Sequence, residues 1–110
     1  MRIVGGQNRG HTIQSPPGRI ARPMRDQVRE ALFQRLGDVS DKVVLDLFAG
    51  SGSLGLEALS RGAARVTFVD RAKVCLSCVR RNVQAIGAED RSSIRRHDLA
   101  SGLSGLSDEG

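Results

Sequence analysis

The stretch Val43–Gly55, VVLDLFAGSGSLG, decides the fold of this chain. An apolar run that holds one carboxylate, Asp46, leads into a glycine-rich turn and then into a helix-like segment. This order is typical of a buried strand, a tight turn and a helix that aims its free N–H groups at a ligand. Glycine is needed there because the backbone must turn tightly and approach the ligand closely. The stretch therefore predicts a site for a nucleotide-like small molecule.

The segments after this stretch continue the alternation of strand and helix. We expect three strands, at residues 42–48, 65–70 and 92–96. We expect two helices between them, at residues 53–61 and 72–86, ended by Gly62 and Gly87. This order predicts an α/β fold with a Rossmann-like parallel sheet of about three strands, which is half of a doubly wound sheet.

The segment before the stretch predicts a hairpin, a loop and a helix. Glycines and β-prone residues favour a short hairpin over residues 2–14, and a Ser-Pro-Pro-Gly sequence favours a loop over residues 15–18. A helix should follow Pro23, because apolar residues recur there at spacings of three and four. These apolar residues are Val28, Ala31, Leu32 and Leu36. The side chains expected to point away from that stripe, toward a partner, are those of Arg22, Arg25 and Arg29.

The positive charge of the chain is concentrated in its first third. The net charge is +5; residues 1–37 hold seven arginines against two carboxylates, whereas residues 38–110 hold ten basic and ten acidic groups. Arginine suits a polyanion because its fork binds phosphate and releases counterions, although a solvated arginine-rich face would have the same composition. We therefore expect a basic extension that binds nucleic acid (residues 1–37), a cofactor-binding half domain (38–98) and a flexible tail (99–110).

Several protein classes are disfavoured. No apolar run approaches the roughly 20 residues of a membrane span, and the N-terminus lacks the apolar region of a signal peptide, so a cytoplasmic location without membrane contact is expected. Cys75 and Cys78 form one C-x-x-C with no second pair. Since they fall inside an expected helix, we interpret them as small residues on one helix face, and we expect no metal site.

Three carboxylates accompany the ends of the expected strands. Asp46 suits a ligand with positive charge, such as the sulfonium of S-adenosylmethionine; alternatively it bonds nearby backbone N–H groups. Asp70, 20 residues after Gly50, can accept both hydroxyls of a ribose or can cap the next helix. Asp98 can accept from an adenine amino group or can serve a turn.

Other interpretations of the same residues stay open. The pattern G-x-G-x-x-G with Asp70 also fits an NAD(P)-dependent oxidoreductase, and Arg71 would suit the ribose phosphate of NADP. His11 and His97 are expected on the surface or facing RNA rather than in catalysis.

Five strings of this sequence, taken together, match those of a known family. They are RIVGGQNRG near the start, RPMRDQVREALF (22–33), VLDLFAGSGSLGLEALSRGA (44–63), VTFVD (66–70) and RHDL (96–99). In these strings the chain resembles the bacterial 16S ribosomal RNA guanine-N2 methyltransferases, which have the class I S-adenosylmethionine-dependent fold. The resemblance implies methylation of the exocyclic N2 amine of a guanine, with S-adenosylmethionine as cofactor. It implies 16S rRNA or a small-subunit assembly intermediate as partner, and a monomer.

The resemblance also implies site residues. Cofactor contacts are expected from Asp46, Phe48, Ala49, Gly50, Gly52 and Gly55, with the ribose at Asp70 and the adenine edge at Asp98. RNA contacts are expected from Arg2, Arg9, Arg19, Arg22, Arg25 and Arg29. The residues expected near the methionine end of the cofactor and the RNA entrance are Arg22, Pro23, Asp26 and Arg29. Met24 departs from the family, which commonly has Thr there.

One motif of the family is missing from this sequence. In the family a D/N-P-P-Y/F tetrad holds the flipped guanine, whereas the only prolines here are Pro16, Pro17 and Pro23 and tyrosine is absent. No catalytic residue is therefore identified, and we expect the chain to stop before the catalytic motif. The alternative is a non-catalytic remnant that binds RNA or S-adenosylmethionine.

Overall fold

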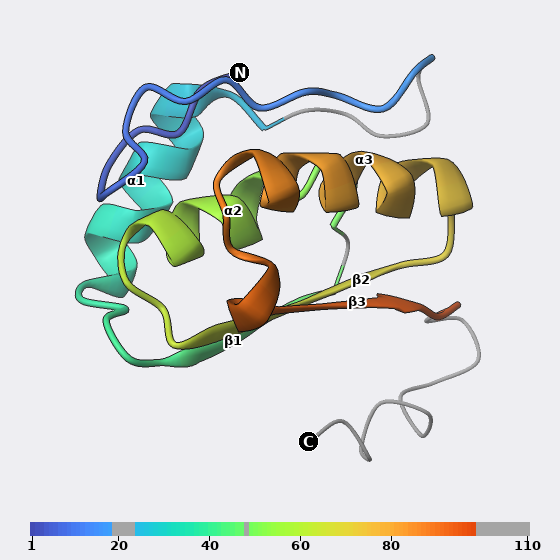
Figure 1. The fold of residues 1–110 in the computed structure, drawn as a ribbon. Coiled ribbons are helices and arrows are strands. Elements are labelled where there is room, and N and C mark those ends of the chain that lie inside the picture. The colour runs from blue at the N-terminus through green and yellow to red at the C-terminus, as the bar shows by residue number, and fades with distance from the viewer. Residues whose placement is uncertain (19–23, 48, 99–110) are drawn as a thin grey trace.

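The centre of the fold is a three-stranded parallel sheet. The structure is a computed structural model that describes residues 1–18, 24–47 and 49–98. The strands are β1 (Val43–Asp46), β2 (Arg65–Asp70) and β3 (Ser92–Arg96), in the order β1-β2-β3. The connecting helices α2 (Ser53–Ser60) and α3 (Lys73–Ala85) cover the same face of the sheet (Figure 1), and a short 3₁₀ helix, η1 (Glu89–Arg91), leads into β3. The predicted α/β fold is confirmed, with β1 shorter than expected.

The register of the sheet brings the strand ends to one edge. Asp46 pairs with Phe68, and Asp70 pairs with Arg96, in parallel alignment. β2 therefore extends beyond β1 by two residues, which carries Asp70 past the end of its neighbour. Ligands of open α/β sheets bind outside this carboxyl edge.

Helix α2 lies very close to the central strand because it carries Gly55. A Cβ atom at position 55 would lie 2.2 Å from Cε1 of Phe68 and 2.8 Å from Cγ1 of Val66. Both of these strand side chains are fully buried under the helix. Any residue larger than glycine would push α2 away from β2.

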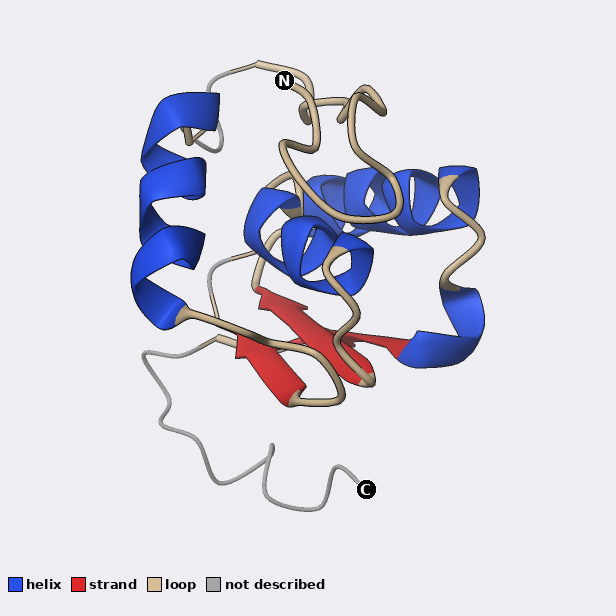
Figure 2. Ribbon diagram, turned by 90° about the vertical axis from the view of Figure 1, so that its left-hand side faces the viewer, coloured by secondary structure: helices blue, strands red, loops and turns tan. Residues whose placement is uncertain are grey.

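The first 14 residues form the short hairpin that we expected, which we call the N-terminal loop: Ile3 N–H donates to the carbonyl of His11 at 2.9 Å, and Ile13 N–H donates to the carbonyl of Met1 at 2.7 Å. Its two arms meet at a single antiparallel bridge between Arg2 and Thr12. Ile3 and Ile13, beside that bridge, are 1% and 2% exposed and belong to the same hydrophobic core as β2 and α2. The loop thus packs onto the sheet-and-helix unit, over α2 (Figure 2).

Helix α1 (Asp26–Leu36) presents a different face to the protein from the one we expected. Its buried residues are Arg29 and Phe33, whereas Val28 and Leu36 are 54% and 59% exposed. The predicted apolar stripe and the predicted outward direction of Arg29 are therefore wrong. The physical reason is a buried carboxylate on α2, described below, that pairs with Arg29 and turns this side of α1 inward.

Two further observations concern the surface. On β1, Val43 and Leu45 are 76% and 52% exposed.

Within the described part of the chain, no helix is both long and apolar enough to cross a membrane. The expected tail at residues 99–110 lies outside the described residues.

Candidate functional site

A glycine loop at residues 49–52 joins β1 to α2 and defines the candidate site. Ala49 N–H donates to the carbonyl of Val69 at 3.0 Å, which continues the pairing of β1 with β2. Gly50 and Gly52 have φ values of 55° and 87°, in the left-handed region that favours glycine. The loop therefore turns sharply at the carboxyl edge of the sheet and points the first turn of α2 toward it.

Asp70 connects this loop to the start of α3. Its Oδ2 accepts from the N–H of Gly50 at 3.0 Å, and its Oδ1 accepts from the N–H of Ala72 at 2.9 Å. Helix α3 has Ala72 as its N-cap and no side-chain cap hydrogen bond, so Asp70 is not the cap that the alternative expected. The bond to Gly50 adds a role that we did not predict. A carboxylate has about four acceptor positions, so these two bonds leave room for a ligand's hydroxyl groups.

Asp46 is held against the first turn of α2. It is 6% exposed, and its Oδ2 accepts from the N–H of Gly55 at 3.3 Å. This contact is the backbone alternative considered above. A carboxylate at this place also complements the positive end of the helix dipole.

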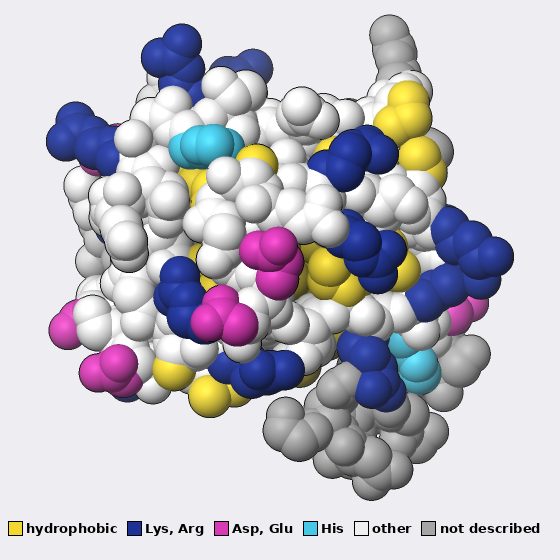
Figure 3. Space-filling view, viewed as in Figure 1, with side chains coloured by type: hydrophobic (Ala, Val, Ile, Leu, Met, Phe, Trp, Pro, Cys, Tyr) yellow, Lys and Arg dark blue, Asp and Glu magenta, His cyan; other side chains and the backbone are white. Residues whose placement is uncertain are grey.

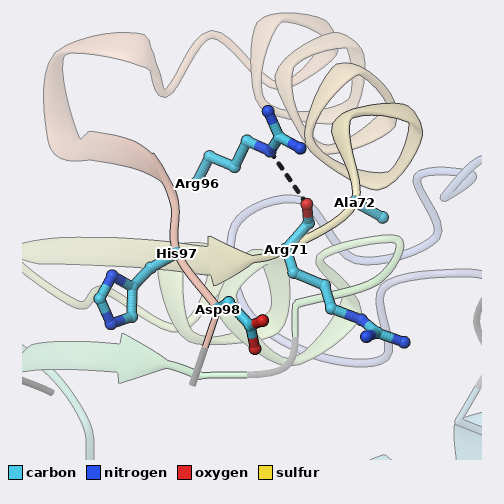
Figure 4. A pocket seen from close by; sticks show the side chains of 5 residues that line it. All are labelled: Arg71, Ala72, Arg96, His97 and Asp98. Atoms are coloured by element: carbon cyan, nitrogen blue, oxygen red, sulfur yellow. Dashed lines mark hydrogen bonds between the residues drawn. The ribbon is translucent and has the colours of Figure 1, made fainter. Parts of the chain in front are cut away.

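Asp98 lies in an open pocket beside the end of β2. The pocket has a volume of about 570 Å³ and is lined by Arg71, Ala72, Arg96, His97 and Asp98. Figure 4 shows the Asp98 carboxylate between the side chains of His97 and Arg71. Two bonds shape this pocket: Arg96 Nε donates to the carbonyl of Arg71, and His97 N–H donates to the carbonyl of Asp70, both at 3.1 Å.

The structure thus gathers most of the predicted cofactor residues at one edge of the sheet. Asp46, Ala49, Gly50 and Asp70 meet around the glycine loop, and Asp98 follows the neighbouring strand. Gly52, like Gly55, faces the core, because a Cβ there would lie 3.2 Å from Val79. Phe48 lies outside the described residues.

Sequence reasoning missed a fully buried carboxylate, Glu57 of α2. It accepts four hydrogen bonds, two from backbone N–H groups of the N-terminal loop and two from guanidinium groups. The donors are Val4 N at 2.9 Å, Gly5 N at 2.8 Å, Arg29 Nε at 2.9 Å and Arg61 Nε at 2.9 Å. The Arg61 guanidinium also lies over the ring of Phe33, 5.1 Å from its centroid. The available signal was a carboxylate within an otherwise apolar helix.

Sequence reasoning also missed Asn82, which links the N-terminal loop to the glycine loop. Its amide nitrogen donates to the carbonyls of Gln14 and Ser51, each at 2.9 Å, and its Oδ1 accepts from Gln14 N–H at 3.0 Å. Asn82 is 4% exposed. A polar residue between Val79 and Val83 on the buried face of α3 was the signal.

The predicted RNA-binding arginines divide into three groups. Arg2, Arg9 and Arg25 are exposed, whereas Arg19 and Arg22 lie outside the described residues. Arg29 is a correction, because its side chain is fully buried between Glu57 and Asp26 and is not available to a partner.

The two cysteines are buried on α3, as expected for small residues on one helix face. Cys75 and Cys78 are free thiols, and burial raises the pKa of both. A raised pKa disfavours the thiolate that metal binding and redox exchange require. Among the described residues no group of three His, Cys, Asp or Glu side chains is placed to hold a metal ion.

Comparisons with known proteins agree on one family. A model of the family described as conserved hypothetical protein 95 matches residues 1–109. The Bacillus subtilis protein YlbH, named as a candidate rRNA methyltransferase, is 36% identical over 104 residues, which are 94% of this chain and 56% of YlbH. Ribosomal RNA small subunit methyltransferase D of Escherichia coli K12 is 52% identical over 71 residues, which are 64% of this chain and 36% of that protein.

A solved structure supports the same relationship. The Escherichia coli protein yhhF, described as a candidate methyltransferase, has a TM-score of 0.82 at 37% identity, covering 94% of this chain and 56% of yhhF. This likeness confirms the predicted Rossmann-like sheet of the class I methyltransferases. The chain spans 56% of the length of both YlbH and yhhF.

Proposed function

This chain belongs to the conserved hypothetical protein 95 family, and from that premise we propose that it binds S-adenosylmethionine and serves the methylation of 16S ribosomal RNA in the cytoplasm. The relatives named as rRNA methyltransferases support the reaction and the RNA class. The choice of the guanine N2 amine rests on the resemblance of the sequence strings given above. The 110 residues supply the cofactor-binding and RNA-docking parts of this activity.

The observation that carries the proposal is the position of Asp70. Its carboxylate lies at the carboxyl edge of the sheet and holds both Gly50 and Ala72 by their N–H groups. The remaining acceptor positions fit the two hydroxyl groups of a ribose. Asp98, in the adjoining pocket, would accept from an adenine amino group.

Asp46 supports a cofactor with positive charge. It is a nearly buried carboxylate beside the glycine loop, where a dinucleotide would bring only phosphate. S-adenosylmethionine, when bound, supplies an electrophilic methyl group on a sulfonium. Asp46 would attract that charge and help to orient the methionine end of the cofactor.

The RNA-docking part is assigned to the exposed arginines Arg2, Arg9 and Arg25. They lie on the N-terminal loop and next to α1. Phosphate contacts of this kind position an RNA without reading its sequence. Arg29 is left out because it is buried, and the residues that would hold the guanine are not identified in this chain.

Calorimetric titration with S-adenosylhomocysteine tests the cofactor proposal. We expect this compound to bind and NAD or NADP to give no heat of binding. Binding of a nicotinamide cofactor without any response to S-adenosylhomocysteine would replace the methyltransferase proposal with that of an oxidoreductase.

A second candidate function is RNA and cofactor binding without catalysis. It is favoured by the absence of the D/N-P-P-Y/F tetrad from these 110 residues. Transfer of a tritiated methyl group from S-adenosylmethionine to 16S rRNA separates the two. Binding of both ligands without transfer supports the second candidate for this chain.

A further inference from the structure

The outer face of helix α3 carries basic residues at its start and in its C-terminal half. Its exposed charged residues are Lys73, Arg80 and Arg81, and the helix contains no acidic residue. Residues 71–87 hold four basic groups and no carboxylate. This local excess of positive charge is not visible in the total for residues 38–110, where ten basic and ten acidic groups cancel. Figure 3 shows Lys and Arg side chains over α3 and toward the end of β3, on the right of the view, and further Lys and Arg side chains on the left.

Carboxylates in the core do not reduce this surface charge. Glu57 is neutralised inside the protein by Arg29 and Arg61. Asp46 is buried. The next acidic residues along the chain, Glu89 and Asp90, lie in η1, beyond the C-terminal end of α3.

This basic face connects the two parts of the proposed site. At its N-terminal end, Lys73 follows Arg71 and Ala72, which line the pocket together with Arg96. Farther along, the N-terminal loop lies beside α3, because Asn82 bonds both the N–H and the carbonyl of Gln14. A 13-residue helix is about 20 Å long, enough to follow several successive phosphates.

We propose that Lys73, Arg80 and Arg81 of α3 form a phosphate-binding track that holds RNA along the outer face of this helix, between the N-terminal loop and the end of α3 that lies beside the cofactor pocket. This inference rests on the proposed function and adds residues outside the arginine-rich first third. The track binds the sugar-phosphate backbone, because cationic side chains bind phosphate oxygens without reading the base sequence.

The test compares two exposed lysines in the 110-residue chain. Lys73→Gln removes a charge from the track, and Lys42→Gln is the matched control, because Lys42 precedes β1 at the opposite edge of the sheet. The double variant Lys73→Gln/Arg80→Gln enlarges the effect. Binding of a fluorescent 16S rRNA helix is measured by anisotropy over a range of salt concentrations.

We expect the slope of log affinity against log salt to become shallower by roughly 1 in Lys73→Gln and by roughly 2 in the double variant, and to stay unchanged in Lys42→Gln. S-adenosylhomocysteine affinity and the circular dichroism spectrum should be unchanged in all three variants. These two measurements separate a lost phosphate contact from a folding defect.

Three results would overturn the inference. If the wild-type chain binds the RNA and the double variant keeps the wild-type slope, the track is wrong and the proposed function stands. If the wild-type chain binds S-adenosylhomocysteine but no RNA, the RNA part of the proposed function fails together with the track. Should the double variant lose affinity for phosphatidylserine vesicles while keeping its RNA affinity, the basic face belongs to a lipid surface instead.

Discussion

Arg29 Nε donates to Glu57 Oε1 at 2.9 Å, and the side chains of both residues are completely excluded from solvent. The same carboxylate accepts the N–H groups of Val4 and Gly5 and the guanidinium of Arg61. One buried charge on α2 therefore fixes α1 and the N-terminal loop in place. The position of the proposed RNA-docking arginines depends on this group.

Replacing Glu57 by Gln should destabilise the fold strongly. The buried Arg29 would lose its counter-charge, which costs about 3–5 kcal/mol when one partner of a buried pair is removed. Urea unfolding followed by circular dichroism measures the change. Glu30→Gln, on the exposed face of α1, is the control and should change stability by less than about 0.5 kcal/mol. Equal effects of the two substitutions would contradict the role given to Glu57.

Acid should destabilise the protein through Glu57. Burial by itself would raise the pKa of Glu57, but the hydrogen bonds it accepts outweigh burial and lower the pKa from the ordinary 4.5. A lowered pKa means that the carboxylate stabilises the fold above about pH 4.5 and that this contribution is lost as the pH falls through the folded-state pKa. Melting temperatures from about pH 7 to about pH 3 should fall steeply in the wild type and less in Glu57→Gln. Parallel curves would show that other carboxylates cause the acid loss.

Gly6→Ala should cost much more stability than Gly10→Ala. Both glycines have a left-handed φ, at 79° and 86°, so each substitution carries a similar backbone penalty of about 1–2 kcal/mol. At position 6 the new Cβ would also lie 2.1 Å from the Ser60 carbonyl oxygen, whereas at position 10 nothing lies within 4 Å. The difference in unfolding free energy between the two variants measures the docking of the N-terminal loop on α2. A difference near zero would mean that the loop does not rest there in solution.

Asp70→Ala should weaken S-adenosylhomocysteine binding by about 1–3 kcal/mol, because buried ribose hydroxyls lose a charged acceptor. Asp90→Ala, on the exposed surface of η1, is the control for a lost negative charge. Titration calorimetry gives both affinities. The melting temperature of Asp70→Ala is needed as well, since Asp70 also holds Gly50 and Ala72. Unchanged affinity would remove Asp70 from the cofactor site.

Both thiols should resist modification in the folded protein. Burial protects Cys75 and Cys78 and raises their pKa, so the reactive thiolate is scarce at neutral pH. Ellman's reagent should react slowly with the native chain and quickly in concentrated guanidinium. Fast reaction of either cysteine in the native state would contradict the burial of this helix face.

The sequence predicted the sheet better than it predicted the N-terminal loop. The boundaries of β2 and β3 agree with expectation, because a short apolar run in β2 and the turn residues that flank the strands are local signals. The short hairpin is confirmed by its antiparallel bridge, but its pairing stays short because Glu57 and Ser60 of α2 bind the N–H groups of Val4, Gly5 and Asn8. That competition arises between residues more than fifty positions apart, so no local pattern shows it.

In the candidate site, too, residues with local sequence signals were predicted and residues placed by long-range contacts were missed. Asp46 within the first expected strand, Gly50 in the glycine motif and Asp70 at the end of the second strand were proposed from the sequence, and the structure brings them to one edge of the sheet. The orientation of α1 was missed because apolar periodicity treats every arginine as exposed. Arg29 is buried only because Glu57, 28 positions away, neutralises it.

The contact between Gly55 and Phe68 limits what the glycine motif indicates about ligand binding. The third glycine is required by the ring beneath it, and the requirement would persist in a descendant that had stopped binding any nucleotide. A match to this glycine pattern therefore indicates close packing of the helix on the strand. The kind of ligand has to be inferred from neighbouring side chains such as that of Asp70, because packing alone does not require a carboxylate there.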